Sequence, residues 1–402
     1  MIQSFDTSLR VALVSGGLKL GGSTTFLCNL AGELIRRGIA AEVVSFEKEN
    51  PLASDFAQQH IPVTCFDDRR CIFEDRMQMT LAALRRFQPT VVLATLSATS
   101  FEVLRYLPPG VFRVAVAQSD DPRIYPGIAN YAGHLDAVAA VSAIMRQKMA
   151  AQPPLAKIPV HYLPYGVPMR LAAKLPPRAA AAPLRILYLG RLWREQKRVH
   201  VFPGILRGLA ASGQPFHWTI AGEGEELEFL QANLKSPAPS QTVAFAGRVS
   251  YAAVPALLQQ HDIFLLASDY EGLPLSLLEA MSQGLVPVVS DLKSGIPEVV
   301  NATNGCLVPV EDVGGYARAI LHLHHHRDEL VAKSLAARAR VRQEFSVAAM
   351  TDRWLAIFPQ GKPTIGGWPD GWKIRPLLAT RKPLYFSPPV RALRRIAAKL
   401  RS

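Results

Sequence analysis

Short, uniformly apolar segments alternate with longer segments of helical periodicity along most of the chain, and this alternation limits the fold more than any other feature. The first apolar segment, 11–14, leads through a Gly-rich turn at 16–22 into a stretch where apolar residues recur three and four positions apart, as in a helix. Gly38 stands where this helix should end. Apolar strands separated by helices indicate a parallel sheet with both faces covered. We expect its strands at 11–14, 42–44, 61–63, 91–93, 114–116, 137–141 and 160–163.

The alternation stops once and then starts again, which divides the chain. Residues 169–183 are small, contain proline and lack periodicity, as is typical of an interdomain linker. The pattern therefore predicts two doubly wound α/β domains, which bind ligands at the carboxyl ends of their strands. Strands of the second sheet are expected at 186–189, 217–220, 243–245, 263–266 and 286–289. The predicted segments are an N-terminal Rossmann-like domain at 1–168, a linker at 169–183, a second Rossmann-like domain at 184–340, a C-terminal helix at 341–358 and a tail at 359–402.

Composition excludes several other classes of protein. Of the 402 residues 49% are apolar, which is too many for a disordered chain. The four cysteines include no CxxC pair, so neither a disulfide scaffold nor a cysteine metal site is predicted, and a reducing compartment is indicated. Neither a signal peptide nor an apolar run long enough for a membrane-spanning helix is evident. We expect a cytoplasmic protein, either soluble or peripheral on the inner face of the cell membrane.

The most informative segment is 268–281, SDYEGLPLSLLEAM, which follows an apolar strand. Pro274 is expected in the first turn of a helix, a position that proline favours. Backbone N–H groups from Gly272 onward would then be free to bind a phosphate or sugar oxygen. Glu271 and Glu279 stand eight positions apart, and carboxylates accept hydrogen bonds from sugar hydroxyls. Taken alone, the segment fits a solvated pair of acids on an ordinary turn equally well.

A second segment, LGRLWREQK, supplies cations to a strand-to-helix loop. Arg191 can form two parallel hydrogen bonds to a phosphate, and Lys197 adds a point charge. Together they suit a diphosphate leaving group. Gly222 and Gly247 follow the next two strands, but each is a weak signal alone, and AGEGEE is not the GxGxxG fingerprint of dinucleotide binding.

In combination these motifs resemble the GT-B-fold retaining glycosyltransferases of family 4. The motifs GRLxxxxK, AGEGEE, FAGRV and E-x7-E occur in the family's order between residues 186 and 300. The N-terminal half is similar more loosely, through Gly21, Gly22 and the helix after them, and the tail is not covered. The resemblance implies the GT-B fold, with two Rossmann-like domains facing across a cleft. It also implies transfer of a sugar from a UDP- or GDP-linked donor, with retention at the anomeric carbon, to an acceptor on the side of the N-terminal domain.

The resemblance further implies roles for individual residues. Arg191 and Lys197 would neutralise the departing diphosphate. Glu271 would hold the hydroxyls of the donor sugar and Glu279 those of the ribose, while the Gly21–Gly22 loop would close on the phosphates. The other donor-binding positions implied are Gly190, Gly222, Gly247, Gly272, Leu273 and Pro274. No cofactor or metal is expected, because two cations can replace the metal ion and the chain contains no DxD triplet.

One position departs from the family's pattern. Members often place a histidine after a strand of the N-terminal domain to contact the donor sugar, and here Gln118 stands at that position. Glutamine takes up no proton but can hydrogen-bond a hydroxyl. The rival hypothesis is therefore a catalytically silent GT-B module that binds a nucleotide-sugar or a glycan. A sugar-nucleotide epimerase of the same architecture is a weaker alternative, because GRL and EGLPLSLLE are typical of transferases.

The C-terminal tail carries most of the net charge of +13. Residues 361–402 hold ten Lys or Arg and one acid, which gives +9. In 388–401 apolar residues recur on one helical face with cations around the rest, as in a basic amphipathic helix on an anionic membrane. Packing of that face on the enzyme is the alternative, and nucleic acid is a less favoured partner. A membrane position would suit a lipid-linked acceptor, as in polysaccharide or lipopolysaccharide assembly, and removal of the chain after Phe358 should leave the body folded.

A cluster of four histidines, AILHLHHHRDEL, lies late in a predicted helix. His322 and His326 stand four positions apart, as metal ligands on a helix can. A solvated helix end is the favoured interpretation, because positive charge is stabilised at a helix C-terminus.

Overall fold

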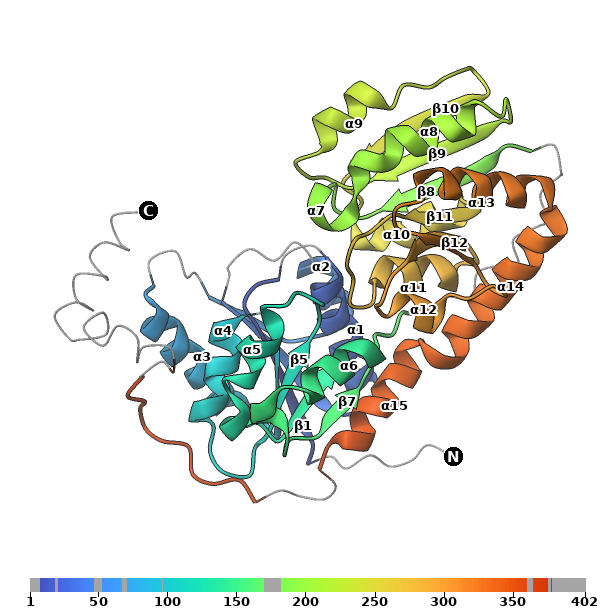
Figure 1. Cartoon of the computed structure of the whole chain (residues 1–402). Coiled ribbons are helices and arrows are strands. Elements are labelled where there is room, and N and C mark those ends of the chain that lie inside the picture. Colours follow the sequence, from blue (N-terminus) through green and yellow to red (C-terminus); the bar gives the residue numbers. More distant parts are fainter. Residues whose placement is uncertain are drawn as a thin grey trace. The chain divides into compact units, whose positions relative to one another are not determined.

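The computed structural model describes residues 8–18, 21–46, 53–66, 71–95, 97–169, 182–359, 364–374 and 377. They belong to two compact units, each with one parallel sheet, and Figure 1 shows helices flanking both sheets. The first unit is drawn from 1–141, 146–163 and 351–402, and the second from 142–145 and 164–350. The predicted class, an α/β protein with two doubly wound domains, is confirmed.

The first unit has a seven-stranded sheet in the order β3-β2-β1-β4-β5-β6-β7. Every adjacent pair is parallel, and the central strands are buried except at the first residue of β1 and the first two of β5. The order reverses between β1 and β4, so the carboxyl ends of these strands form the edge where ligands bind in such sheets. The strands are β1 (Arg10–Ser15), β2 (Ala40–Ser45), β3 (Val63–Cys65), β4 (Val91–Thr95), β5 (Phe112–Ala117), β6 (Ala137–Ala140) and β7 (Val160–Tyr162).

Helix α1 covers this sheet as its apolar periodicity predicts. It buries Phe26 and Leu30, and Gly38 follows its end with a φ of +81°, which confirms the predicted helix end. The last helix that the structure describes packs on it, since the rings of Phe26 and Trp354 lie 6.1 Å apart. The helices around the first sheet are α1 (Gly22–Arg36), α2 (Ala53–Gln58), α3 (Phe73–Phe87), α4 (Ala98–Val103), α5 (Ile124–Ala129), α6 (Ala143–Ala150) and α15 (Val347–Ile357).

Part of the predicted tail packs on the first unit. Residues 364–374 and 377, hereafter the strap, include Ile374, which is only 2% exposed. The Gly366 N–H donates to the carbonyl oxygen of Pro109 at 2.8 Å. A truncation after Phe358 would therefore remove a buried side chain, and whether it leaves the body folded stays a prediction. The predicted amphipathic segment, 388–401, lies outside the described residues.

The second unit has a six-stranded parallel sheet in the order β10-β9-β8-β11-β12-β13. The strands are β8 (Leu184–Leu189), β9 (Phe216–Ala221), β10 (Gln241–Gly247), β11 (Ile263–Leu266), β12 (Val286–Asp291) and β13 (Cys306–Pro309). The helices are α7 (Arg194–Lys197), α8 (Phe202–Ala210), α9 (Leu227–Asn233), α10 (Val254–Gln259), α11 (Leu275–Ser282), α12 (Ile296–Val299), α13 (Val313–His325) and α14 (Arg327–Glu344). Short 3-10 helices in the two units are Leu104–Tyr106, Ala132–His134, Pro153–Leu155, Val199–Val201 and Tyr251–Ala253.

The elements differ from the predicted ones in a few places. β13 was not predicted, and β3 begins at Val63, two residues later than expected. The segment expected as one helix, 341–358, contains the end of α14 and then α15. Most of the predicted linker, 170–181, lies outside the described residues. Among the helices that the structure describes, none is both long enough and apolar enough to cross a bilayer.

Candidate functional site

Three glycine-containing loops join at the carboxyl edge of the second sheet. They follow the neighbouring strands β8, β9 and β10 and contain the motifs GRL, AGEGEE and FAGRV. The Gly190 N–H donates to the Ala221 carbonyl oxygen at 3.0 Å, and the Gly222 N–H donates to the Gly247 carbonyl oxygen at 2.7 Å. The structure thus brings together three of the predicted donor-binding glycines, Gly190, Gly222 and Gly247, in one hydrogen-bonded layer.

Only glycine fits at position 222 in this layer. Gly222 has a φ of +141°, and a Cβ atom there would lie 1.9 Å from the carbonyl oxygen of Gly190. A contact so short would push the GRL loop away from β9. The sequence signal at Gly222, weak by itself, therefore has a steric cause.

Arg191 stands on the surface of this layer. Its Nη2 donates to Gln196 Oε1 at 2.7 Å, and its guanidinium lies 4.8 Å from the ring centre of Trp193. The Tyr188 hydroxyl donates to the Arg191 carbonyl oxygen at 2.6 Å. Burial, and next the charge of Glu271, raise the pKa of Tyr188 well above its usual range, so this donor stays protonated. Arg191 is thus exposed, but Tyr188 holds its backbone, and Gln196 and Trp193 contact its side chain.

Lys197 and Glu271 form a buried ion pair. Lys197 Nζ lies 2.5 Å from Glu271 Oε1, and the two side chains are 11% and 6% exposed. The Ser268 hydroxyl donates to the same oxygen at 2.7 Å. Among the described residues nothing donates to Glu271 Oε2, which leaves that oxygen able to accept from a ligand hydroxyl. The pair joins two predicted site residues that are 74 positions apart.

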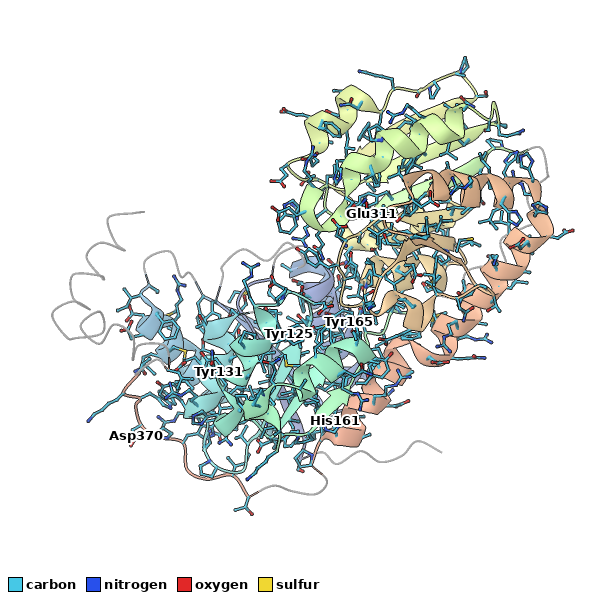
Figure 2. All side chains as sticks on the ribbon, in the orientation of Figure 1. Tyr125, Tyr131, His161, Tyr165, Glu311 and Asp370 are labelled. Carbon is cyan, nitrogen blue, oxygen red and sulfur yellow. The ribbon has the colours of Figure 1, made fainter. Side chains whose placement is uncertain are left out.

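Neighbouring contacts fasten the loop after β11 to α7. The Asp269 N–H donates to the Gln196 carbonyl oxygen at 2.9 Å, and Gln196 Nε2 donates to the Tyr270 carbonyl oxygen at 3.3 Å. Arg198 pairs with Asp269 at 2.8 Å and with Glu311, labelled in Figure 2, at 3.5 Å. Sequence reasoning missed these residues, although all but Glu311 lie inside or beside the motifs. Their effect is to fix the position of Lys197 and Glu271.

Helix α11 begins one residue later than predicted. Pro274 is the residue before the helix, with extended ψ of 118°, rather than part of the first turn. The Gly272 carbonyl oxygen accepts from the Gly295 N–H at 2.8 Å, which anchors the loop. Within the described part of the chain, no residue accepts a hydrogen bond from the N–H groups of Gly272 and Leu273. Both donors are therefore available to a ligand, as the sequence predicted.

Glu279 lies on α11 beside a small cavity. The side chain is partly exposed, and no described residue donates to its carboxylate. Burial raises the pKa of Glu279 to about 7, because the charged form loses hydration without gaining a partner. The cavity is lined by Val167, Pro168, Tyr251, Val254, Pro255, Leu258, Glu279, Ser282 and Gln283. A carboxylate without a protein donor can accept hydrogen bonds from the hydroxyls of a ligand.

The remaining predicted residues lie at the carboxyl edge of the first sheet. Gly21 precedes α1 with a φ of +151°, its carbonyl oxygen accepts from the N–H groups of Thr24 and Thr25, and Gly22 is the first helical residue. Gln118 directly follows β5 and is 9% exposed. Within the described chain, neither its amide oxygen nor its amide nitrogen has a partner. A buried amide in this state is costly unless a ligand or water satisfies it.

The histidine cluster shows no metal-binding arrangement. His322 Nε2 lies 2.7 Å from Glu329 Oε2, and its ring stacks on that of His326 at 4.1 Å. The described residues include no group of three or more His, Cys, Asp or Glu that could hold a metal ion. The contact with Glu329 favours the interpretation of a solvated helix end.

The sequence of residues 183–326 matches the family described as Glycosyl transferases group 1, and residues 20–171 match Glycosyltransferase Family 4. The putative colanic acid biosynthesis glycosyltransferase WcaL of Escherichia coli (strain K12) is 36% identical over 208 residues, 50% of this chain and 50% of the relative. The amylovoran biosynthesis glycosyltransferase AmsK of Erwinia amylovora is 38% identical over 171 residues, 41% of this chain and 42% of the relative. The matches thus span half or less of these relatives.

A solved structure supports the same fold. The crystal structure of Anabaena HepE in complex with UDP and glucose is similar with a TM-score of 0.71 at 18% identity, covering 87% of this chain and 98% of that chain. This similarity confirms the predicted GT-B fold.

Proposed function

Since the chain belongs to the glycosyltransferases of group 1 and family 4, we propose that it is a retaining, metal-independent hexosyltransferase. Its donor is a UDP- or GDP-linked sugar and its acceptor a glycan or a lipid-linked glycan of cell-surface polysaccharide or lipopolysaccharide assembly. The relatives named for colanic acid and amylovoran biosynthesis support this acceptor class, and the UDP-bound neighbour supports the donor class.

One observation carries the proposal: the cations and the sugar-binding groups follow two adjacent strands of one sheet, β8 and β11. Arg191, which is exposed, and Lys197 come after β8. Glu271, which pairs with Lys197, and the free N–H groups after it come after β11. Arg191 and the Lys197 ammonium stabilise the diphosphate as its charge grows in the transition state. Because Glu271 and Gln196 already hold these cations, little reorganisation is needed when charge develops, and such preorganisation is often the largest catalytic contribution.

Glu271 has a second role toward the donor sugar. Its Oε1 is occupied by Lys197 and Ser268, so Oε2 accepts from a sugar hydroxyl. The N–H groups of Gly272 and Leu273 donate to sugar or phosphate oxygens next to it. Gln118, from the first unit, donates to or accepts from a sugar hydroxyl without moving a proton, and Gly21 and Gly22 bind phosphate oxygens.

Two cations in place of a metal ion make the reaction independent of divalent metal. The rival function is a catalytically silent module that binds nucleotide-sugar or glycan, which the glutamine at position 118 motivates. An assay for free nucleoside diphosphate distinguishes the transferase from the silent module. It uses a panel of UDP- and GDP-sugars, with and without a cell-envelope lipid extract and with and without EDTA. Binding without release for every donor would favour the silent module.

Glu279 is proposed to bind the ribose hydroxyls of the donor. Glu279→Ala should raise the donor KM and weaken the affinity for UDP by about tenfold or more, because bonds to a charged acceptor contribute about 1.5–3 kcal/mol each. Turnover should change less, since the ribose gains no charge during transfer. Calorimetry with UDP alone measures the effect, and unchanged affinity would exclude the ribose role.

The same residue predicts a pH dependence. Only the ionised carboxylate can accept two ribose hydrogen bonds, and burial places the pKa of Glu279 at about 7. Below pH 7 the wild-type affinity for UDP should therefore fall as the carboxyl takes up a proton, and above pH 7 it should level off. Glu279→Gln is the matched control, because its remaining pH dependence reports only the titration of the UDP phosphate. Identical pH profiles for the two proteins would contradict this assignment.

The tail is proposed to attach the enzyme to an anionic membrane surface. Clustered cations contribute about 1 kcal/mol each at such a surface, and the contribution falls with salt. Full-length protein should sediment with vesicles of phosphatidylglycerol but not with vesicles of phosphatidylcholine alone, and less at high salt. Protein that ignores both kinds of vesicle would favour packing of the tail on the enzyme instead.

A further inference from the structure

Helix α3 and the strap border a hollow on the surface of the first unit. Its volume is about 690 Å³, which is within the range of sites that hold small ligands. The side chains that line it include Gln78, Arg85 and Arg86 of α3, with Asp370 and Trp372 of the strap. Figure 2 labels Asp370 on the strap. None of these residues belongs to the candidate functional site.

One wall of the hollow is the outer face of α3. The opposite face of this helix packs toward the sheet, where Leu81 and Leu84 are fully buried. On the outer face Ala82 is exposed, with Gln78 one turn before it and Arg85 one turn after it. Because Ala82 carries only a methyl group, space stays open between the two longer polar side chains.

The strap forms the other wall and is fastened to the same face. Gln78 Nε2 donates to the carbonyl oxygen of Trp372, and Arg85 Nη2 donates to Asp370 Oδ1 at 3.0 Å. Ile374, which is 2% exposed, anchors the strap two residues after Trp372. These contacts hold the backbone on both sides of the Trp372 ring, so the wall is in place before a ligand arrives.

The arginines of the hollow are each offset by a carboxylate. Arg85 pairs with Asp370 at 3.0 Å, and Arg86 pairs with Glu42 at 3.1 Å. A guanidinium has five N–H groups, so donors remain on both arginines after these contacts. The hollow therefore offers hydrogen bonds without the excess of positive charge that a phosphate group requires. This balance favours an uncharged ligand with many hydroxyls.

Trp372 adds a flat apolar surface and an indole N–H. Its Nε1 is buried and accepts no partner among the described residues, although a buried indole N–H usually has one. An oxygen of a bound ligand would supply that partner. One face of a sugar ring carries mainly C–H groups, which pack on an aromatic ring, while its hydroxyls bond to planar polar side chains such as those of Arg, Asp and Gln.

We propose that this hollow binds a neutral saccharide. The ring of Trp372 packs against the C–H face of a sugar unit, Asp370 and Gln78 accept from its hydroxyls, and Arg85 and Arg86 donate to its oxygens.

The hollow is separate from the candidate donor site. Arg85 and Arg86 occupy the last turn of α3, which leads to the amino end of β4. Gly21 and Gln118 lie instead at the carboxyl edge of the same sheet. The role of the hollow rests on the proposed function: it holds a sugar unit of the acceptor glycan away from the reacting end. A second contact of this kind raises the affinity for long acceptors over short ones.

Fluorine NMR of the full chain labelled with 5-fluorotryptophan tests the binding. The five tryptophans are assigned by single substitutions with phenylalanine. The probes are linear tetrasaccharides of glucose, of galactose and of mannose at millimolar concentration, with inorganic pyrophosphate for comparison. We expect at least one tetrasaccharide to shift the signal of Trp372 and to leave that of buried Trp354 unchanged. The inference is overturned if no tetrasaccharide shifts Trp372, or if pyrophosphate alone does.

Two tryptophan variants locate the site. Trp372→Ala should weaken the affinity for the bound tetrasaccharide about tenfold or more, because it removes the aromatic surface at the centre of the contact. Trp368→Ala is the matched control: Trp368 also lies on the strap with a buried indole N–H, but it does not line the hollow. Calorimetry measures both affinities, and thermal unfolding checks that both variants fold. Equal affinities in the two variants would overturn the inference.

A third variant tests the balance of charge. Asp370 is fully exposed, so Asp370→Asn should fold normally while leaving Arg85 without its carboxylate. Its affinity for a tetrasaccharide of glucuronic acid should rise severalfold relative to wild type, and the affinity for the neutral tetrasaccharide should change less. Wild-type protein that already prefers the acidic tetrasaccharide would overturn the assignment to neutral saccharides.

Failure of this inference is distinguishable from failure of the proposed function. Release of nucleoside diphosphate without any shift of Trp372 leaves the transferase and removes the second site. A saccharide that binds at Trp372, with no release from any donor, leaves the site and favours the silent module. In a working transferase, Trp372→Ala should raise the KM of a long acceptor severalfold and leave that of a monosaccharide acceptor unchanged. An equal rise for both acceptors would contradict the role in holding the acceptor glycan.

Discussion

Replacing Lys197 by alanine should lower kcat at saturating donor by about 10²- to 10³-fold, the loss typical of removing one preorganised donor to a developing negative charge. It should also destabilise the second unit by about 3 kcal/mol, because Glu271 would remain buried with only Ser268 as a partner. Donor binding should weaken less than turnover, since the diphosphate gains charge as the bond breaks.

A second substitution separates the loss of turnover from the loss of stability. In Lys197→Ala/Glu271→Gln the buried charge is gone, so part of the stability should return while kcat stays low. Urea unfolding measures the stability and single-turnover rates measure the chemistry. A double variant that regains wild-type turnover would show that Lys197 acts only on folding.

Arg191 gives the complementary case. Because its side chain is exposed, Arg191→Ala should lower kcat to a similar degree with little change in stability. Arg194→Ala is the matched control: Arg194 is an exposed arginine three residues on, paired with Glu226 at 2.9 Å, and its loss should change neither quantity much. Wild-type turnover in both the Arg191 and the Lys197 variants would refute the assigned site.

Gly222→Ala should lower the free energy of unfolding by about 3 kcal/mol or more and should weaken donor binding. The added methyl group would meet the Gly190 carbonyl oxygen at 1.9 Å, and the backbone φ of +141° disfavours any side chain. Either the GRL loop moves, carrying Arg191 with it, or the layer of three loops separates.

Gly213→Ala isolates the backbone contribution. Gly213 also has a positive φ, of +70°, but no atom lies within 4 Å of the position of an added Cβ. Its substitution should therefore cost about 1 kcal/mol, from backbone strain alone. Thermal unfolding of the two variants makes the comparison, and equal midpoints would show that the close approach at Gly222 is relieved without cost.

Strand positions could be predicted where burial alone decides them. The fully apolar segments β1, β4 and β11 lie where expected, because no other element buries such runs on both faces. β3 begins late because Pro62 has no N–H to give a strand partner, although its carbonyl oxygen accepts from the Val43 N–H. β13 was missed because it is short, partly exposed and ends at Pro309.

Contacts between distant motifs could not be predicted in the same way. Lys197 meets Glu271 because β8 pairs with β11, and strand order depends on long-range pairing that periodicity does not reveal. The strap was predicted as part of the basic tail, because residues 361–402 together carry ten Lys or Arg and the strap itself is rich in Gly and lacks a periodic apolar pattern. Its anchors, Ile374 and the backbone of Leu377, carry no local pattern, and the carboxylate that binds Leu377 lies 275 positions away.

The return of α15 to the first unit has a consequence for synthesis on the ribosome. The second unit is nearly continuous in sequence and can fold once residue 350 has emerged, whereas the first unit must wait for α15 and the strap. Until then Phe26 lacks its contact with Trp354, and α1 presents an apolar face to solvent or to a chaperone. If translation is arrested just before Thr351, the first unit should therefore be less completely folded than the second, although most of it was synthesised earlier.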